Sequence, residues 1–225
     1  MIIFAHRGAS AQAPANSKEA FLLARKQGAS CYELDIHLTQ DNRLPVQHDY
    51  VVGDTAHAVQ DFTWPELKNF CAQNQIARPA LLEEILPVVE PELACLNIEL
   101  KNDDNVYPGI EQALLDLLMH HAPNLLPKIL FSSFDILTLQ RVRSLAPQAK
   151  IGLLTRAFNL SHAQDLNAYS VHLNQTRVTP QIVQACHADG RRVFIYTVNT
   201  KEDKERLAQM GVDGIFTDRP DLFLN

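Results

Sequence analysis

Charged and polar side chains occupy every second position in two segments that have the composition of β-strands. Successive side chains of a strand face opposite sides, so in each segment the polar residues share one face and the apolar residues share the other. The apolar face must be buried against neighbouring elements, which turns the polar face toward the interior of the structure that these strands build. The polar residues are Glu33, Asp35 and His37 in segment 31–38, and Asn97, Glu99 and Lys101 in segment 95–101.

Three of these residues are carboxylates, namely Glu33, Asp35 and Glu99. Carboxylates that converge in a poorly solvated space repel one another, so they either take up protons or hold a cation. The cluster offers oxygen ligands and neither a thiolate nor an imidazole pair, so we expect one hard divalent cation, Mg²⁺ or Ca²⁺, with Mn²⁺ as a further candidate. The alternative interpretation is a structural network in which the glutamates pair with Arg7 and Lys101.

Two histidines end predicted strands near this cluster. His6 is followed by Arg7-Gly8, and His48 is followed by Asp49. Imidazoles exchange protons near neutral pH, so His6 and His48 are candidates for a general acid and a general base. The planar guanidinium of Arg7 suits phosphate oxygens, and Gly8 permits a tight turn of the backbone away from the site. These residue types point to acid–base chemistry at a phosphate group.

Short β-rich runs alternate along the chain with longer helical patterns, which is typical of repeated βα units and a mainly parallel sheet. Eight such runs with intervening helices predict an α/β fold, a (β/α)₈ TIM barrel, which closes comfortably at 225 residues. The strands are expected at 2–6, 31–38, 95–101, 129–134, 151–155, 169–174, 193–198 and 214–217. The clearest helical patterns lie at 17–27, 110–121, 135–145, 180–188 and 201–210.

One segment interrupts this alternation. Residues 44–48 also have the composition of a strand, but they follow the second strand after only a turn at Asp41-Asn42. So short a connection cannot form a parallel crossover and predicts a hairpin. We therefore expect a small insertion after the second strand, at about 44–79, with a short helix that begins near Thr63. We expect this insertion to lie over the mouth of the barrel.

The composition narrows the range of functions. The chain has 46% hydrophobic and 20% charged residues, which excludes disorder, and a net charge of −6 with scattered basic residues, which argues against a nucleic-acid partner. No segment approaches the roughly 20 apolar residues of a membrane span, and no basic leader with a cleavage site precedes the first strand. The 4 cysteines lie far apart without a CxxC pair, which predicts reduced thiols. We expect a single cytoplasmic domain, residues 1–225, that acts on a small molecule and has no nucleic-acid or membrane partner. The sequence leaves the oligomeric state open.

The chemistry-bearing residues resemble those of a known family, the glycerophosphodiester phosphodiesterases. Members of that family carry a His-Arg-Gly start, a Glu-x-Asp strand, a His-Asp pair and a Glu-x-Lys strand. Each motif alone is weak, but their joint order and spacing are specific, and the likeness spans nearly the whole chain. The matching segments are His6-Arg7-Gly8, Glu33-Leu34-Asp35, His48-Asp49, Glu99-Leu100-Lys101, Ser132-Ser133-Phe134, Val171-His172-Leu173-Asn174, Tyr196-Thr197-Val198-Asn199 and Thr217-Asp218.

The resemblance implies hydrolysis of glycerophosphodiesters to glycerol 3-phosphate and a free alcohol. It implies that the three carboxylates bind the metal, that the two histidines act as acid and base, and that Arg7 and Lys101 hold the phosphate. His172, which alternation turns inward, and Tyr196, which stands where the family often has an indole, are further candidate substrate contacts. For His172 the alternative is a buried hydrogen-bonding role. The chain departs from the family at Ala15, where a Pro-Glu-Asn-Thr motif usually has a carboxylate.

Two other functions stay open at this point. A phospholipase or lysophospholipase on a similar barrel would need an exposed apolar rim, whereas the predicted insertion mixes charged and apolar side chains. A barrel that only binds a ligand would be expected to lack one of the carboxylates or histidines, and all of them are present. The sequence therefore favours small, water-soluble diesters as substrates. It does not decide which histidine is the acid, or whether water or a substrate hydroxyl attacks the phosphate.

Overall fold

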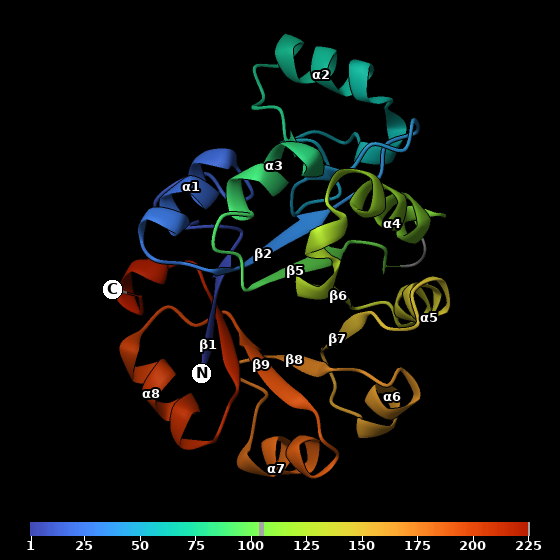
Figure 1. Cartoon of the computed structure of the whole chain (residues 1–225). Coiled ribbons are helices and arrows are strands. Elements are labelled where there is room, and N and C mark those ends of the chain that lie inside the picture. The colour runs from blue at the N-terminus through green and yellow to red at the C-terminus, as the bar shows by residue number, and fades with distance from the viewer. Residues whose placement is uncertain (104–105, 225) are drawn as a thin grey trace.

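The predicted barrel is confirmed in the structure, a computed structural model that describes residues 1–103 and 106–224. Within them, eight parallel strands form a ring, which closes because β1 pairs with both β2 and β10 (Figure 1). Each strand lies within about two residues of its predicted position. The ring consists of β1 (Ile2–His6), β2 (Cys31–Ile36), β5 (Cys95–Leu100), β6 (Ile129–Ser133), β7 (Lys150–Thr155), β8 (Ser170–Asn174), β9 (Arg192–Tyr196) and β10 (Gly214–Thr217).

Helices cover the outside of the ring, and side chains fix where several of them begin. Ser17, for example, accepts a hydrogen bond from the Ala20 amide at the start of α1, which satisfies an otherwise unpaired donor. The helices at the five predicted places are confirmed, but α3 and α6 were not predicted. Helix α3 contains Pro87, a residue that usually interrupts helices, so no helix was predicted there. Helix α6 has only 6 residues, which are too few to show a periodic pattern. The covering helices are α1 (Lys18–Lys26), α3 (Leu82–Val89), α4 (Ile110–His121), α5 (Ile136–Leu145), α6 (Leu160–Asp165), α7 (Pro180–Ala188) and α8 (Lys201–Gln209).

The interior of the barrel is built in two layers. The lower layer is apolar and buried, and it consists of Phe4, Cys31, Leu130, Phe194 and Phe216. Side chains alternate along a strand, so the residue two positions later points into the same interior, closer to the carboxyl ends of the strands. Those upper positions hold His6, Glu33, Ser132, Tyr196 and Asp218. The polar layer therefore lies directly above a buried apolar layer.

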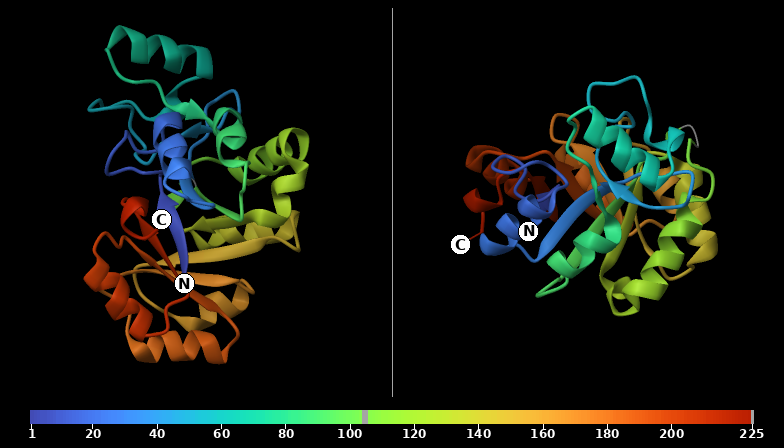
Figure 2. Two further views of the ribbon diagram at one scale, coloured as in Figure 1. Left: turned by 60° about the vertical axis from the view of Figure 1, so that its left-hand side comes forward. Right: turned by 90° about the horizontal axis from the view of Figure 1, so that it is seen from above.

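The insertion after β2 contains the predicted hairpin and helix. Strand β3 (Pro45–Val46) pairs antiparallel with β2 and with β4 (Ala80–Leu81), and α2 (Trp64–Gln73) begins one residue after Thr63. The prediction that the whole insertion lies over the mouth of the barrel is wrong for its helix. A separate apolar cluster that includes Trp64 and Leu67 supports α2, and this helix lies outside the ring of helices rather than over the mouth of the barrel (Figure 1 and Figure 2).

Two further predictions concern the cysteines and the membrane. The structure contains all 4 cysteines as free side chains, and all except Cys95 are buried. Among the described residues, no helix combines the length and the apolar character that crossing a membrane would require.

Candidate active site

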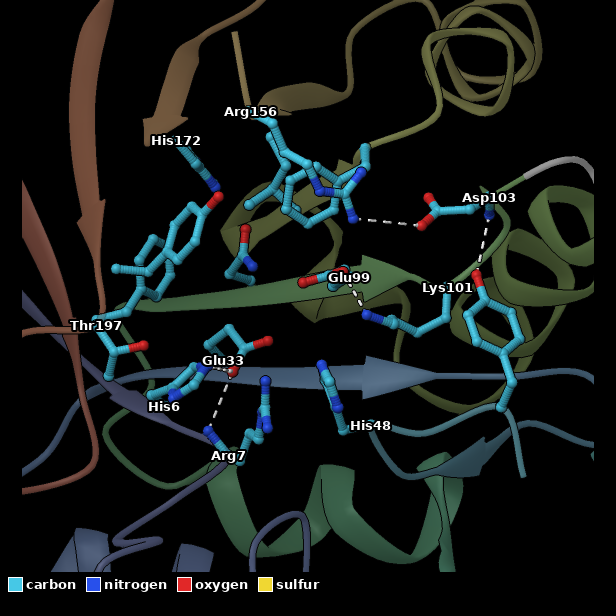
Figure 3. Close-up of a pocket in the computed structure, with 16 residues that line it drawn as sticks. His6, Arg7, Glu33, His48, Glu99, Lys101, Asp103, Arg156, His172 and Thr197 are labelled. Atoms are coloured by element: carbon cyan, nitrogen blue, oxygen red, sulfur yellow. Dashed lines mark hydrogen bonds and ion pairs between the residues drawn. The ribbon is translucent and has the colours of Figure 1, made fainter. Parts of the chain in front are cut away.

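A cavity of about 340 Å³ opens at the carboxyl ends of the barrel strands (Figure 3). This is the end of a (β/α)₈ barrel that carries the active site in characterised enzymes, and the volume lies within the range of small-molecule pockets. Every predicted site residue except Asp35 lines the cavity, and Asp35 is wholly buried beside it. The predicted residues that line the cavity are His6, Arg7, Glu33, His48, Glu99, Lys101, His172 and Tyr196.

The three predicted metal ligands lie together. One carboxylate oxygen each of Glu33, Asp35 and Glu99 can be chosen so that all lie within 4.8 Å of one another. Burial, together with the charge of Asp35, raises the pKa of Glu33 well above its usual range and raises the pKa of Glu99 to about 7. The Oδ1 atom of Asp35 is buried and has no hydrogen-bond partner. An unsatisfied buried oxygen within an all-oxygen acidic cluster fits a hard divalent cation.

Two cationic side chains contact the carboxylates. These are the ion pairs that we expected if the cluster were a structural network rather than a metal site. Arg7 places its Nε atom 3.0 Å from Asp35 and donates its backbone N–H to Glu33. Lys101 donates from Nζ to Glu99 at 3.0 Å. Burial lowers the pKa of Lys101, but the charges of Glu99 and Asp35 outweigh it, so the net shift is upward. The lysine is therefore charged, and these two ion pairs still leave one carboxylate in excess.

His6 is held by a residue that the sequence analysis noted only as part of a motif. The Nδ1 atom of His6 lies 2.7 Å from Oδ1 of Asp218, which follows the last strand of the barrel. Asp218 also accepts hydrogen bonds from Ser10 Oγ and from Asn199 Nδ2. Burial raises the pKa of Asp218, but these three donors lower it more, to about 2, so it is ionised. With Nδ1 bound to Asp218, Nε2 is the nitrogen that His6 offers to the pocket, 3.9 Å from Glu33.

His48 sits on the insertion, and its position depends on His37. The Nδ1 atom of His48 contacts Asp49, and the carbonyl oxygen of His48 lies 3.3 Å from Nε2 of His37. His37 was predicted to point into the barrel beside Glu33, but it does not line the cavity, because its ring packs between Tyr50 and Tyr107. His37 is buried against Tyr107, and burial lowers its pKa to about 4. A neutral His37 therefore supports the backbone that carries His48.

Asn16 also supports the site. Its Nδ2 atom donates to Oδ2 of Asp35 at 3.0 Å, and it is only 3% exposed. Asn16 has φ 61°, a left-handed conformation that asparagine tolerates better than most residues. The neighbouring Ala15, where the family pattern has a carboxylate, is exposed. The loop therefore reaches the acidic cluster through Asn16.

His172 and Tyr196 form part of the inner wall. His172 is wholly buried, and its Nε2 atom lies 2.8 Å from Ser170 Oγ. Burial lowers the pKa of His172 to about 3, so the ring is neutral. A Cβ atom on Gly152 would lie 2.6 Å from this ring, so the glycine makes room for it. Tyr196 packs edge-on against Phe134, and burial raises its pKa.

Comparison with known proteins identifies the class. A glycerophosphodiester phosphodiesterase of Caldanaerobacter subterraneus is 35% identical over 100% of this chain and 96% of the relative. A glycerophosphodiester phosphodiesterase of Bacillus altitudinis is 35% identical over 97% of this chain and 95% of the relative. Among solved structures, an Oleispira antarctica phosphodiesterase in complex with the product sn-glycerol-3-phosphate matches with a TM-score of 0.88 and 28% identity, over 99% of this chain and 94% of the other.

Fold, pocket and relatives together define a phosphoric diester hydrolase built on a (β/α)₈ barrel. The model of the glycerophosphoryl diester phosphodiesterase family matches residues 6–222. The chain belongs to this family.

Proposed function

We propose that this pocket hydrolyses glycerophosphodiesters to glycerol 3-phosphate and an alcohol, with one divalent cation and two catalytic histidines. The carboxylates of Glu33, Asp35 and Glu99 would hold the cation, Mg²⁺ or Ca²⁺ by the hardness of the donor set. When bound, the cation would polarise the phosphate and neutralise charge on its oxygens. The observation that carries the proposal is the unsatisfied acidic cluster, which two basic side chains and two imidazoles surround at the mouth of the barrel.

The charges of the pocket support a diester rather than a polyphosphate. A carboxylate must be ionised to bind a metal, and three ionised carboxylates beside the two cations Arg7 and Lys101 leave one net negative charge at the cluster. One divalent cation changes this to one net positive charge, which matches the single negative charge of a phosphodiester. Arg7 would orient the phosphate with its planar guanidinium, and Lys101 would act as a point charge.

The hydrogen bonds of the histidines support their assignment as acid and base. Asp218 binds Nδ1 of His6 and Asp49 binds Nδ1 of His48, so each imidazole uses its Nε2 atom for proton exchange. In Figure 3 the two rings appear on opposite sides of Glu33. One imidazole would take the proton of the attacking water or substrate hydroxyl, and the other would protonate the departing alcohol oxygen; a cyclic phosphate formed by the hydroxyl route would then be opened by water in the same way.

The test is the release of glycerol 3-phosphate from glycerophosphoglycerol and glycerophosphocholine by the purified protein. We expect turnover that a chelator abolishes and that Mg²⁺ or Ca²⁺ restores. Glu33→Gln should lose the turnover, whereas Glu202→Gln, an equal change of charge on exposed α8, should retain it. Turnover of lysophosphatidylcholine below its micelle concentration, in preference to the deacylated diesters, would instead support a lysophospholipase. Turnover that is insensitive to the chelator would contradict the role of the carboxylates.

A further inference from the structure

One side of the pocket mouth is formed by three residues that follow neighbouring strands, and we call them the rim. They are Asp103 after β5, Phe134 after β6 and Arg156 after β7. In Figure 3, Arg156 and Asp103 lie across the pocket from His6 and Arg7. The Arg156 side chain is 72% exposed and that of Asp103 is 36% exposed, so the rim meets solvent.

A phosphodiester has two arms, and the pocket offers them two different environments. The inner wall is closed, since His172 is wholly buried and Phe216 is 2% exposed. A closed wall selects an arm of constant shape, and an exposed rim accommodates an arm that varies. With the phosphate at Arg7 and Lys101, glycerol suits the inner wall and the variable alcohol suits the rim.

The rim already holds a cation where a cationic alcohol would bind. The guanidinium carbon of Arg156 lies 4.4 Å from the centre of the Phe134 ring, which is the position that a quaternary ammonium takes on an aromatic face. Arg177 donates to the carbonyl oxygen of Arg156 and adds a second positive charge. Asp103 offsets one of these charges and lies 3.9 Å from Arg156. Within residues 1–103 and 106–224, a further exposed carboxylate beside a pocket residue, Asp49, is bound to His48.

We infer that Arg156 selects the alcohol arm of the substrate, against cationic alcohols and in favour of neutral polyols and alcohols that carry a negative charge. The guanidinium offers several N–H donors, which suit hydroxyl, carboxylate and phosphate oxygens. A choline or ethanolamine arm would meet this charge and would find the Phe134 face covered. The inference rests on the proposed diester hydrolysis and specifies which diesters the pocket favours.

The test compares two diesters of similar size, glycerophosphoglycerol with a neutral arm and glycerophosphocholine with a cationic arm. We expect kcat/KM to favour glycerophosphoglycerol by about three- to tenfold, the effect of one charge at a few ångströms in a largely aqueous setting. Arg156→Gln should remove most of this preference by improving the choline diester. Arg156→Glu should reverse it, and Arg156→Lys should retain it, because the lysine keeps the charge. Arg206→Gln, on exposed α8 outside the pocket, is the matched control and should change nothing.

Binding of both diesters to the His48→Ala variant, measured by titration calorimetry, separates this inference from catalysis. A binding preference for the neutral arm that depends on Arg156 supports the inference even if no diester is turned over, in which case the proposed function fails alone. Equal or tighter binding of glycerophosphocholine, unchanged by Arg156→Gln, overturns the inference even if both diesters are hydrolysed.

Discussion

Asp218→Asn should disable His6 while leaving the barrel intact. Asp218 accepts three hydrogen bonds, at 2.7 Å from His6, 2.9 Å from Ser10 and 2.7 Å from Asn199. Asn199 cannot rotate its amide to compensate, because its Oδ1 atom already accepts from the Asp218 backbone N–H at 2.9 Å and from Thr217 Oγ1 at 3.1 Å. In either orientation, the side-chain amide introduced at position 218 would therefore direct its N–H₂ group at a hydrogen-bond donor, either the Asn199 amide or the pair of His6 and Ser10.

The least costly solution is a change of tautomer at His6. Its Nδ1 atom would then accept a hydrogen bond, and Nε2 would carry the proton that a general base must lack. As a general acid, the ring would lose the carboxylate that stabilises its charged form. Either role predicts a loss of about 10²- to 10⁴-fold in kcat, the usual size of a general acid or base contribution, with a smaller change in KM.

The assay is steady-state release of glycerol 3-phosphate at saturating cation, with urea unfolding to confirm the fold. Asp213→Asn is a matched control, because Asp213 binds His187 at 2.8 Å in a similar pair that does not line the pocket. We expect the control to retain kcat. Near-normal kcat for Asp218→Asn, or an equal loss in the control, would refute the proposed role of Asp218.

Three further predictions address the metal, the second histidine and stability. Glu99→Gln should weaken Mg²⁺ and Ca²⁺ binding in calorimetric titrations, because it removes one charged oxygen ligand; unchanged affinity would remove Glu99 from the ligand set. His48→Ala should lower kcat by about 10²- to 10⁴-fold with cation binding intact, and normal turnover of a diester with a poor leaving group would reassign the residue. The pKa of His172 is about 3 in the folded protein, so between pH 6.5 and 3 the unfolded chain binds a proton that the folded protein excludes. This group should therefore lower the free energy of unfolding by up to about 1.4 kcal/mol for each unit by which the pH is lowered within that range. His172→Gln should reduce the difference in stability between pH 7 and pH 5 in urea titrations. The same difference in both proteins would show that His172 does not contribute to the pH dependence.

Local patterns were enough to predict the barrel and the strand positions that bring the acidic residues together. Alternation along β2 and β5 placed Glu33, Asp35 and Glu99 on the interior face, because a strand has a fixed period of two residues. The short connection after β2 predicted a hairpin for a reason that is equally local, since a few residues cannot cross over to a parallel strand.

Contacts between distant parts of the chain could not be predicted in the same way. Asp218 and His6 are 212 residues apart and meet only because the last strand pairs with the first. Asn16 reaches Asp35 through a left-handed backbone that no periodic pattern reveals. His37 was predicted to face the pocket, but it packs against Tyr50 and Tyr107, which lie 13 and 70 residues away along the chain and which no local pattern pairs with it.

Because the first and last strands close the ring, the protein cannot assemble its pocket until the last strand has been synthesised. A chain that is synthesised at about 5–20 residues per second carries His6 for roughly 10–40 s before Asp218 is made. Until then β1 lacks its neighbour β10, and the imidazole has no carboxylate to orient it. The acidic residues of β2 are made early, but the pair of His6 and Asp218, to which we assign proton transfer, forms only when the barrel closes. We therefore expect chains that lack β10 and Asp218 to show little or no activity.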